Sequence, residues 1–107
     1  MPVIRIDYDN TKLEQDEVLT LSKAIQKIVS ETTKIEDVFV YANSSQIKVK
    51  IAPIEIFIQM SAHKIKNVDK LVSKIKSKLL DWKKKNHFNH LINLTFIPMN
   101  WKIDIGI

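Results

Sequence analysis

The sequence contains no cysteine and only one glycine. Without cysteine, the chain cannot form disulfides, offer a thiolate nucleophile or build a zinc site from cysteine ligands. With a single glycine, it lacks the glycine-rich loops that cradle phosphates in nucleotide-binding proteins. No apolar run approaches the roughly 18 residues of a membrane-spanning helix, and the first residues lack the charged and apolar regions of a secretion signal. These absences predict a cytoplasmic protein that makes no membrane contact.

The remaining composition is that of a globular chain. The sequence has 107 residues, of which 45% are hydrophobic, and this proportion argues against a disordered chain. The length suffices for one hydrophobic core but not for two. No linker, repeat or low-complexity segment divides the sequence, so we expect a single domain over residues 1–107.

Arginine is nearly absent, whereas lysine is abundant. Of the 17 basic residues, 16 are lysines spread through the chain and one is Arg5, and the net charge is +5. Dispersed lysines favour a solvated surface over a nucleic-acid groove. The densest run, Lys83–Lys85, falls at an expected helix end, where the helix dipole favours cations. A lone arginine suits the planar, two-pronged binding of a carboxylate, although an ion pair of Arg5 with Asp7 or Glu55 is equally compatible with the sequence.

Hydrophobic periodicity predicts the order of helices and strands. Alternating apolar residues indicate strands, and apolar residues at helical spacing indicate amphipathic helices. The expected strands are Pro2–Tyr8, Val38–Ala42, Ile54–Met60 and Leu91–Ile97, with a short ribbon over Ile47–Ile51. The expected helices are Leu13–Glu31, which Thr32, Thr33 and Lys34 end, and a second helix that Asn67 caps and Asn86–Asn89 end. The second helix should bury Val68, Leu71, Val72, Ile75, Leu79 and Trp82, and expose Lys70, Lys74 and Lys78.

This order is a βαβ unit followed by another βαβ unit. Amphipathic helices must bury their apolar faces against a sheet, and right-handed crossovers leave few topologies. We expect an α+β fold in which a four-stranded mixed sheet carries two helices on one face. Ferredoxin-like RNA-recognition modules share this order, but they need aromatic residues and glycine on a central strand. The corresponding segment, Ile54–Gln59, has one aromatic residue and no glycine, which disfavours such a module and a nucleic-acid partner.

Pro2 has two interpretations. Proline lacks an N–H and is tolerated as the first residue of a strand, so its role can be purely structural. If Met1 is removed, Pro2 instead carries a free secondary amine held rigidly at the end of a strand. A model α-amino group titrates at roughly 7.7–8.0, and burial lowers the pKa of a cationic group. The amine would then serve as a neutral base near neutral pH.

Several short motifs follow Pro2 in a characteristic order. Thr33 and Lys34 come after the first helix, the segment 61–65 after the third strand, and Phe96–Pro98 before a tail that contains Gly106. In order and spacing, these motifs resemble the tautomerase superfamily, whose branches include macrophage migration inhibitory factor and 4-oxalocrotonate tautomerase. The resemblance is closest to an uncharacterised bacterial branch, and it implies a tandem βαβ tautomerase-like fold.

The resemblance also implies a mechanism and a site. In the superfamily, the processed N-terminal proline acts as general base or acid, cations hold the carboxylate or carbonyl of the substrate, and the pocket lies between the subunits of a trimer. Pro2 therefore takes the base role, on a small carbonyl or enol acid and without a cofactor. The implied substrate-binding residues are Lys34 or, as in the closer branch, Arg5, with Ala62, His63 and Lys64 as a wall or anion contact, and Asn93 and Thr95 from the adjacent subunit.

Two further residue groups affect these expectations. The three histidines, His63, His87 and His90, lack helical pairing, so we expect no metal site. The tail Trp101–Ile107 is too apolar for a free end and should pack on another subunit, which favours a homotrimer because the tail needs a sheet edge to pair with. The alternative to an enzyme is a non-catalytic oligomeric binding module on the same fold, which applies if Met1 stays attached.

Overall fold

The computed structural model describes residues 2–100 and 104–107, with the side chain of Lys64 left out. The elements are β1 (Val3–Tyr8), α1 (Gln15–Thr33), β2 (Phe39–Asn43), β3 (Ile54–Ser61), the 3-10 turn η1 (Ala62–Lys64), α2 (Val68–Lys85) and β4 (Asn93–Met99). Neither helix in this part of the chain is both long and apolar enough to cross a membrane.

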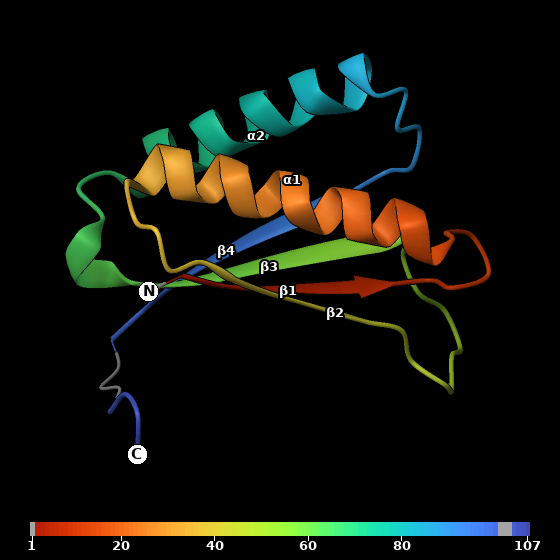
Figure 1. The fold of residues 1–107 in the computed structure, drawn as a ribbon, viewed down its shortest axis with the longest axis horizontal. Helices are drawn as coiled ribbons and strands as arrows, with labels where there is room; N and C mark the ends of the chain where they lie inside the picture. The colour runs from red at the N-terminus through yellow and green to blue at the C-terminus, as the bar shows by residue number, and fades with distance from the viewer. Residues whose placement is uncertain (1, 101–103) are drawn as a thin grey trace.

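The four strands form one mixed sheet in the order β2-β1-β3-β4. β1 runs parallel to β2 and antiparallel to β3, and β3 runs parallel to β4. Each βαβ unit therefore supplies one central and one edge strand. Both helices lie on the same face of this sheet (Figure 1). The predicted four-stranded mixed sheet with two helices on one face is confirmed.

The core lies between the sheet and the helices. Alternate strand residues point toward the helices, so Ile4 and Ile6 on β1 and Ile56 and Ile58 on β3 are fully buried. α1 contributes the predicted apolar face, with Val18, Leu21, Ile25, Ile28 and Val29 buried. In the described part of the chain, the opposite sheet face carries no helix (Figure 1).

α1 begins two residues later than the sequence pattern indicated. Glu14 is its N-cap and forms a reciprocal capping box with Glu17. The preceding turn is built by Asp9, whose Oδ1 accepts hydrogen bonds from the backbone N–H and the hydroxyl of Thr11 at 3.0 and 2.7 Å. Such side-chain bonds hold the backbone in a turn rather than in a helix. Leu13 is buried before the helix starts.

α2 begins as predicted but buries less of its apolar face. The Asn67 side chain accepts a hydrogen bond from the backbone N–H of Lys70 at 3.0 Å. Of the expected buried face, only Ile75 and Leu79 are buried, and Val68 in the first turn is 36% exposed. α2 packs on α1 and β4, and the partly buried Leu71 and Trp82 pack against the core.

Two sequence-based expectations for strands need correction. The segment between β2 and β3 contains no strand, and Ile47 and Val49 are 90% and 100% exposed. Their alternation matches a strand, but a strand also needs a neighbouring edge for its backbone hydrogen bonds. β4 begins at Asn93 rather than at Leu91 and continues to Met99, because its parallel register follows β3 to Ser61. For the expected tail Trp101–Ile107, residues 101–103 lie outside the described part and residues 104–107 form no strand, so its packing on another subunit stays a prediction.

Candidate functional site

Pro2 lies at the start of β1 with its ring fully buried. Its carbonyl oxygen accepts a hydrogen bond from the backbone N–H of Phe39 at 3.2 Å, which ties the residue to β2. In the alternation of β1, Pro2 precedes the buried set of Ile4 and Ile6, so its ring belongs to the helix-facing side. The backbone of Pro2, the residue predicted to carry a free amine, is thus fixed at the start of β1.

Lys34 forms the C-cap of α1. Its φ of 61° and ψ of 28° place it in the left-handed region that commonly ends helices. The turn is held by the Ser30 hydroxyl, which donates to the carbonyl oxygen of Ile35 at 2.8 Å. Lys34 is exposed at the end of the helix, where it borders solvent. The structure therefore leaves this cation able to meet a ligand in solution or at an interface.

The end of β3 leads into η1, which carries the residues predicted to form a wall of the site. The backbone N–H of Ile65 donates to the carbonyl oxygen of Ala62 at 3.2 Å, which closes the short turn. Ala62 is half-buried and His63 is exposed. The side chain of Lys64 lies outside the described residues, so its predicted anion contact stays a prediction.

Arg5, Asn93 and Thr95 lie on the other side of the sheet. The strand registers place Arg5 opposite Phe57, and Phe57 opposite Thr95, on the face that no described helix covers. The Arg5 guanidinium lies 4.5 Å from the centre of the Phe57 ring, and its Nε lies 3.2 Å from an Asp7 carboxylate oxygen. The ion pair considered from the sequence therefore forms with Asp7.

Within one chain, the sheet separates the two groups of predicted site residues. The Pro2 ring lies on the helix side, whereas Arg5, Asn93 and Thr95 belong to the open side. Arg5 alternates with Ile4 and Ile6 as the sequence pattern indicated. A site that combines both groups would require residues from a second copy of the chain.

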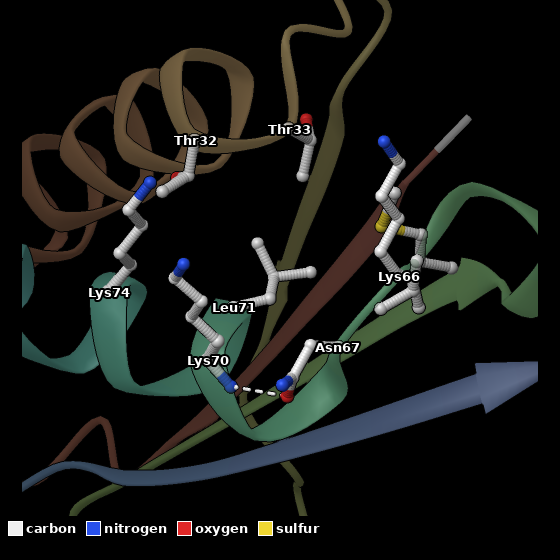
Figure 2. Close-up of a pocket in the computed structure, with 9 residues that line it drawn as sticks. Thr32, Thr33, Lys66, Asn67, Lys70, Leu71 and Lys74 are labelled. Atoms are coloured by element: carbon white, nitrogen blue, oxygen red, sulfur yellow. Dashed lines mark hydrogen bonds between the residues drawn. The ribbon is translucent and has the colours of Figure 1, made fainter.

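A cavity of about 320 Å³ lies near the expected site, between the end of α1 and the start of α2 (Figure 2). It is lined by Thr32, Thr33, Met60, Ile65, Lys66, Asn67, Lys70, Leu71 and Lys74. The sequence pattern places Lys70 and Lys74 on a solvated helix face and gives no reason to single out Lys66. The spacing of four residues between Lys70 and Lys74 is visible in the sequence, but the opposing end of α1 is not.

The histidines do not gather at this end. His90 is half-buried, and its Nε2 lies 2.7 Å from a carboxylate oxygen of Glu17. The pKa of the Glu17 carboxyl is lowered, mainly by the hydrogen bond it accepts from the backbone N–H of Glu14 and then by His90. No group of three or more acidic or histidine side chains that could hold a metal occurs among the described residues.

Comparison with known proteins identifies the fold. No protein-family profile and no curated protein matches the chain in sequence. A 5-carboxymethyl-2-hydroxymuconate delta-isomerase has a TM-score of 0.68 and 10% identity, over 99% of this chain and 89% of its own. A macrophage migration inhibitory factor-like protein from Entamoeba histolytica has a TM-score of 0.61 and 17% identity, over 96% and 93%. A fused 4-OT, solved as an asymmetric trimer, has a TM-score of 0.62 and 10% identity, over 94% and 91%. The chain has the tautomerase-superfamily fold, and the predicted resemblance is confirmed at that level.

Proposed function

We propose that this protein is a tautomerase-like isomerase in which Pro2, after removal of Met1, is the general base. The observation that carries the proposal is the position of Pro2. It stands at the start of β1, buried and tied to β2 by the 3.2 Å hydrogen bond from Phe39 to its carbonyl oxygen, in a fold shared with an isomerase. A proline amine held there would be rigid and shielded from water.

The proposed substrate is a small 2-oxo acid or its enol. The Pro2 nitrogen takes a proton from the carbon next to the carbonyl, the oxygen gains the charge of an enolate, and the proton returns to that oxygen. Lys34 is the proposed cation for the enolate or carboxylate, with Arg5 as the alternative. General acid–base transfer contributes about 10²–10⁴-fold in rate, and fixed charges at a developing enolate add a comparable factor.

The proposed assembly is a homotrimer with shared sites. The sheet separates Pro2 from Arg5, Asn93 and Thr95 within one chain, so a second copy must supply the latter group if they act together. The fused 4-OT with this fold is a trimer. The uncovered sheet face carries Phe39 and Tyr41, which are 43% and 58% exposed, and a second copy would cover such aromatic surface.

A non-catalytic oligomeric binding module is the second candidate. It applies if Met1 stays attached, because the Pro2 nitrogen then lies in a peptide bond and cannot act as a base. Intact-mass spectrometry shows whether Met1 is removed, and a chain that retains Met1 has no free proline amine.

The enzyme proposal is tested by Pro2→Ala with phenylpyruvate and 2-hydroxymuconate as substrates. Pro53→Ala is the matched control, because Pro53 also precedes a strand and its carbonyl accepts a backbone hydrogen bond, from Asp9 at 3.0 Å. We expect Pro2→Ala to lose about 10²-fold or more of kcat/KM and Pro53→Ala to retain it. Unchanged turnover in the Pro2 variant would make Pro2 a structural residue only.

A further inference from the structure

The cavity between the ends of α1 and α2 contains an unusual gathering of positive charge. Three of its nine lining residues are lysines, Lys66, Lys70 and Lys74, and none of the nine is acidic. Figure 2 shows all three lysine side chains extending from the α2 side of the cavity toward the end of α1. All three lysines are exposed, so their amino groups border the cavity where it meets solvent.

These lysines also lack acidic partners within the part of the chain that is described. The next lysine along the same helix face, Lys78, lies 3.8 Å from a carboxylate oxygen of Glu31. By contrast, no carboxylate of the described residues lies within 4.0 Å of the ammonium groups of Lys66, Lys70 or Lys74. Like charges four residues apart on a helix are destabilising, so Lys70 and Lys74 repel each other unless an anion lies between them.

The rest of the lining is suited to the body of a small organic molecule. Met60, Ile65 and Leu71 provide apolar surface. The Asn67 side-chain carbonyl oxygen caps α2 through the backbone N–H of Lys70, which leaves the Asn67 amide hydrogens available to a ligand. The Thr33 hydroxyl donates to the carbonyl oxygen of Val29 at 2.7 Å and can only accept from a ligand.

We propose that this cavity binds a small organic phosphate, with the phosphate among the three ammonium groups and the apolar part against Met60 and Leu71. Lysine binds phosphate as a point charge, and three ammonium groups match a dianion better than a single carboxylate. Neither Pro2 nor Lys34 lines the cavity. The proposal therefore goes beyond the proposed isomerase chemistry and does not depend on it.

The test is an NMR titration of the protein with phenyl phosphate. We expect saturable shifts of the backbone amides of Lys66, Lys70 and Leu71, with affinity that falls as salt is added. Phenyl phosphate should bind more tightly than inorganic phosphate, which lacks an apolar part, and more tightly than succinate, a dicarboxylate. Equal affinity for inorganic phosphate would contradict the role of the apolar surface, and tighter binding of succinate would contradict the choice of phosphate.

Lys70→Gln/Lys74→Gln is the decisive variant. Each charge-assisted contact contributes about tenfold or more in affinity, so the variant should bind phenyl phosphate at least tenfold more weakly. Lys23→Gln/Lys27→Gln is the matched control. It removes two lysines of α1 that are also four residues apart but do not line the cavity. Equal effects of the two variants would show general charge attraction and overturn the site.

Two further measurements test whether the cavity is a site in its own right. The Lys70/Lys74 variant should unfold at no lower temperature than the wild type, because it removes a like-charge pair. A lower unfolding temperature in the variant would contradict that reasoning. Binding should persist in a form whose Pro2 nitrogen is blocked by an added N-terminal residue. Loss of binding in that form would show that binding in the cavity depends on the Pro2 nitrogen, and it would refute the independence of the two sites.

Discussion

Arg5 offers a prediction that separates a structural from a substrate-binding role. Its side chain makes two contacts in the structure, an ion pair with Asp7 at 3.2 Å and a stacking contact over Phe57 at 4.5 Å. The side chains of Arg5 and Asp7 are 51% and 44% exposed. An exposed ion pair is worth about 0.2–1 kcal/mol, and an exposed cation–π contact about 0.5–1 kcal/mol.

Arg5→Gln should therefore destabilise the protein by about 1–2 kcal/mol at most. With a slope of about 2 kcal/mol per molar urea, the unfolding midpoint would fall by roughly 0.5–1 M. Tryptophan fluorescence during urea unfolding measures this midpoint, at one fixed protein concentration because oligomers unfold in a concentration-dependent way. Asp7→Asn is the control, since it removes the ion pair but keeps the contact with Phe57.

The two variants together test the reasoning. Asp7→Asn should lower the free energy of unfolding by less than about 1 kcal/mol, and this variant should retain turnover. If Arg5 binds substrate, folded Arg5→Gln loses tenfold or more in kcat/KM. A loss of stability above about 3 kcal/mol in Arg5→Gln would refute the estimate, and full turnover in that variant would remove Arg5 from the site and leave Lys34 as the cation.

Two other predictions concern local stability. Asn67→Ala should destabilise α2 by about 1 kcal/mol because the backbone N–H of Lys70 loses its acceptor, whereas Asn67→Asp should retain most of the stability; chemical denaturation checks both. The folded-state pKa of Glu17 is lowered from its ordinary 4.5, so its charge stabilises the fold above that value, and this contribution is lost as the pH falls through the folded pKa. The stability difference between wild type and Glu17→Gln should therefore shrink in acid, and a difference that grows in acid would contradict the assignment.

The fold could be predicted from the sequence because its signals are local and repeated. The alternation of Ile4 and Ile6 and the helical spacing of Leu21 and Ile25 each require burial on one side, and the structure buries all four. The sequence also indicates Asn67 as a cap, and the structure confirms it. The sequence pattern misplaces the start of α1 because the hydrogen bonds from Thr11 to Asp9 compete with the helix, and periodicity does not register such competition.

The candidate site was predictable only in part. Residue order and resemblance single out Pro2 and Lys34, whose backbones the structure places at strand and helix ends. The lysine cavity is not evident from the sequence because periodicity does not reveal that the end of α1 lies opposite the exposed Lys66, Lys70 and Lys74. Ile47 and Val49 have the pattern of a ribbon, but their alternation does not reveal whether a partner edge exists.

The central claim is that the nitrogen of Pro2 is the base. The most direct test compares two forms of the protein that differ only at this atom, one with Pro2 as the free N-terminus and one with an added residue that keeps Pro2 in a peptide bond. We predict that the free form tautomerises phenylpyruvate and that its kcat/KM rises with pH. The midpoint of this rise should lie at or below the pKa of an ordinary α-amino group, roughly 7.7–8.0. The blocked form should be inactive. The same rate and pH profile in both forms would contradict the account.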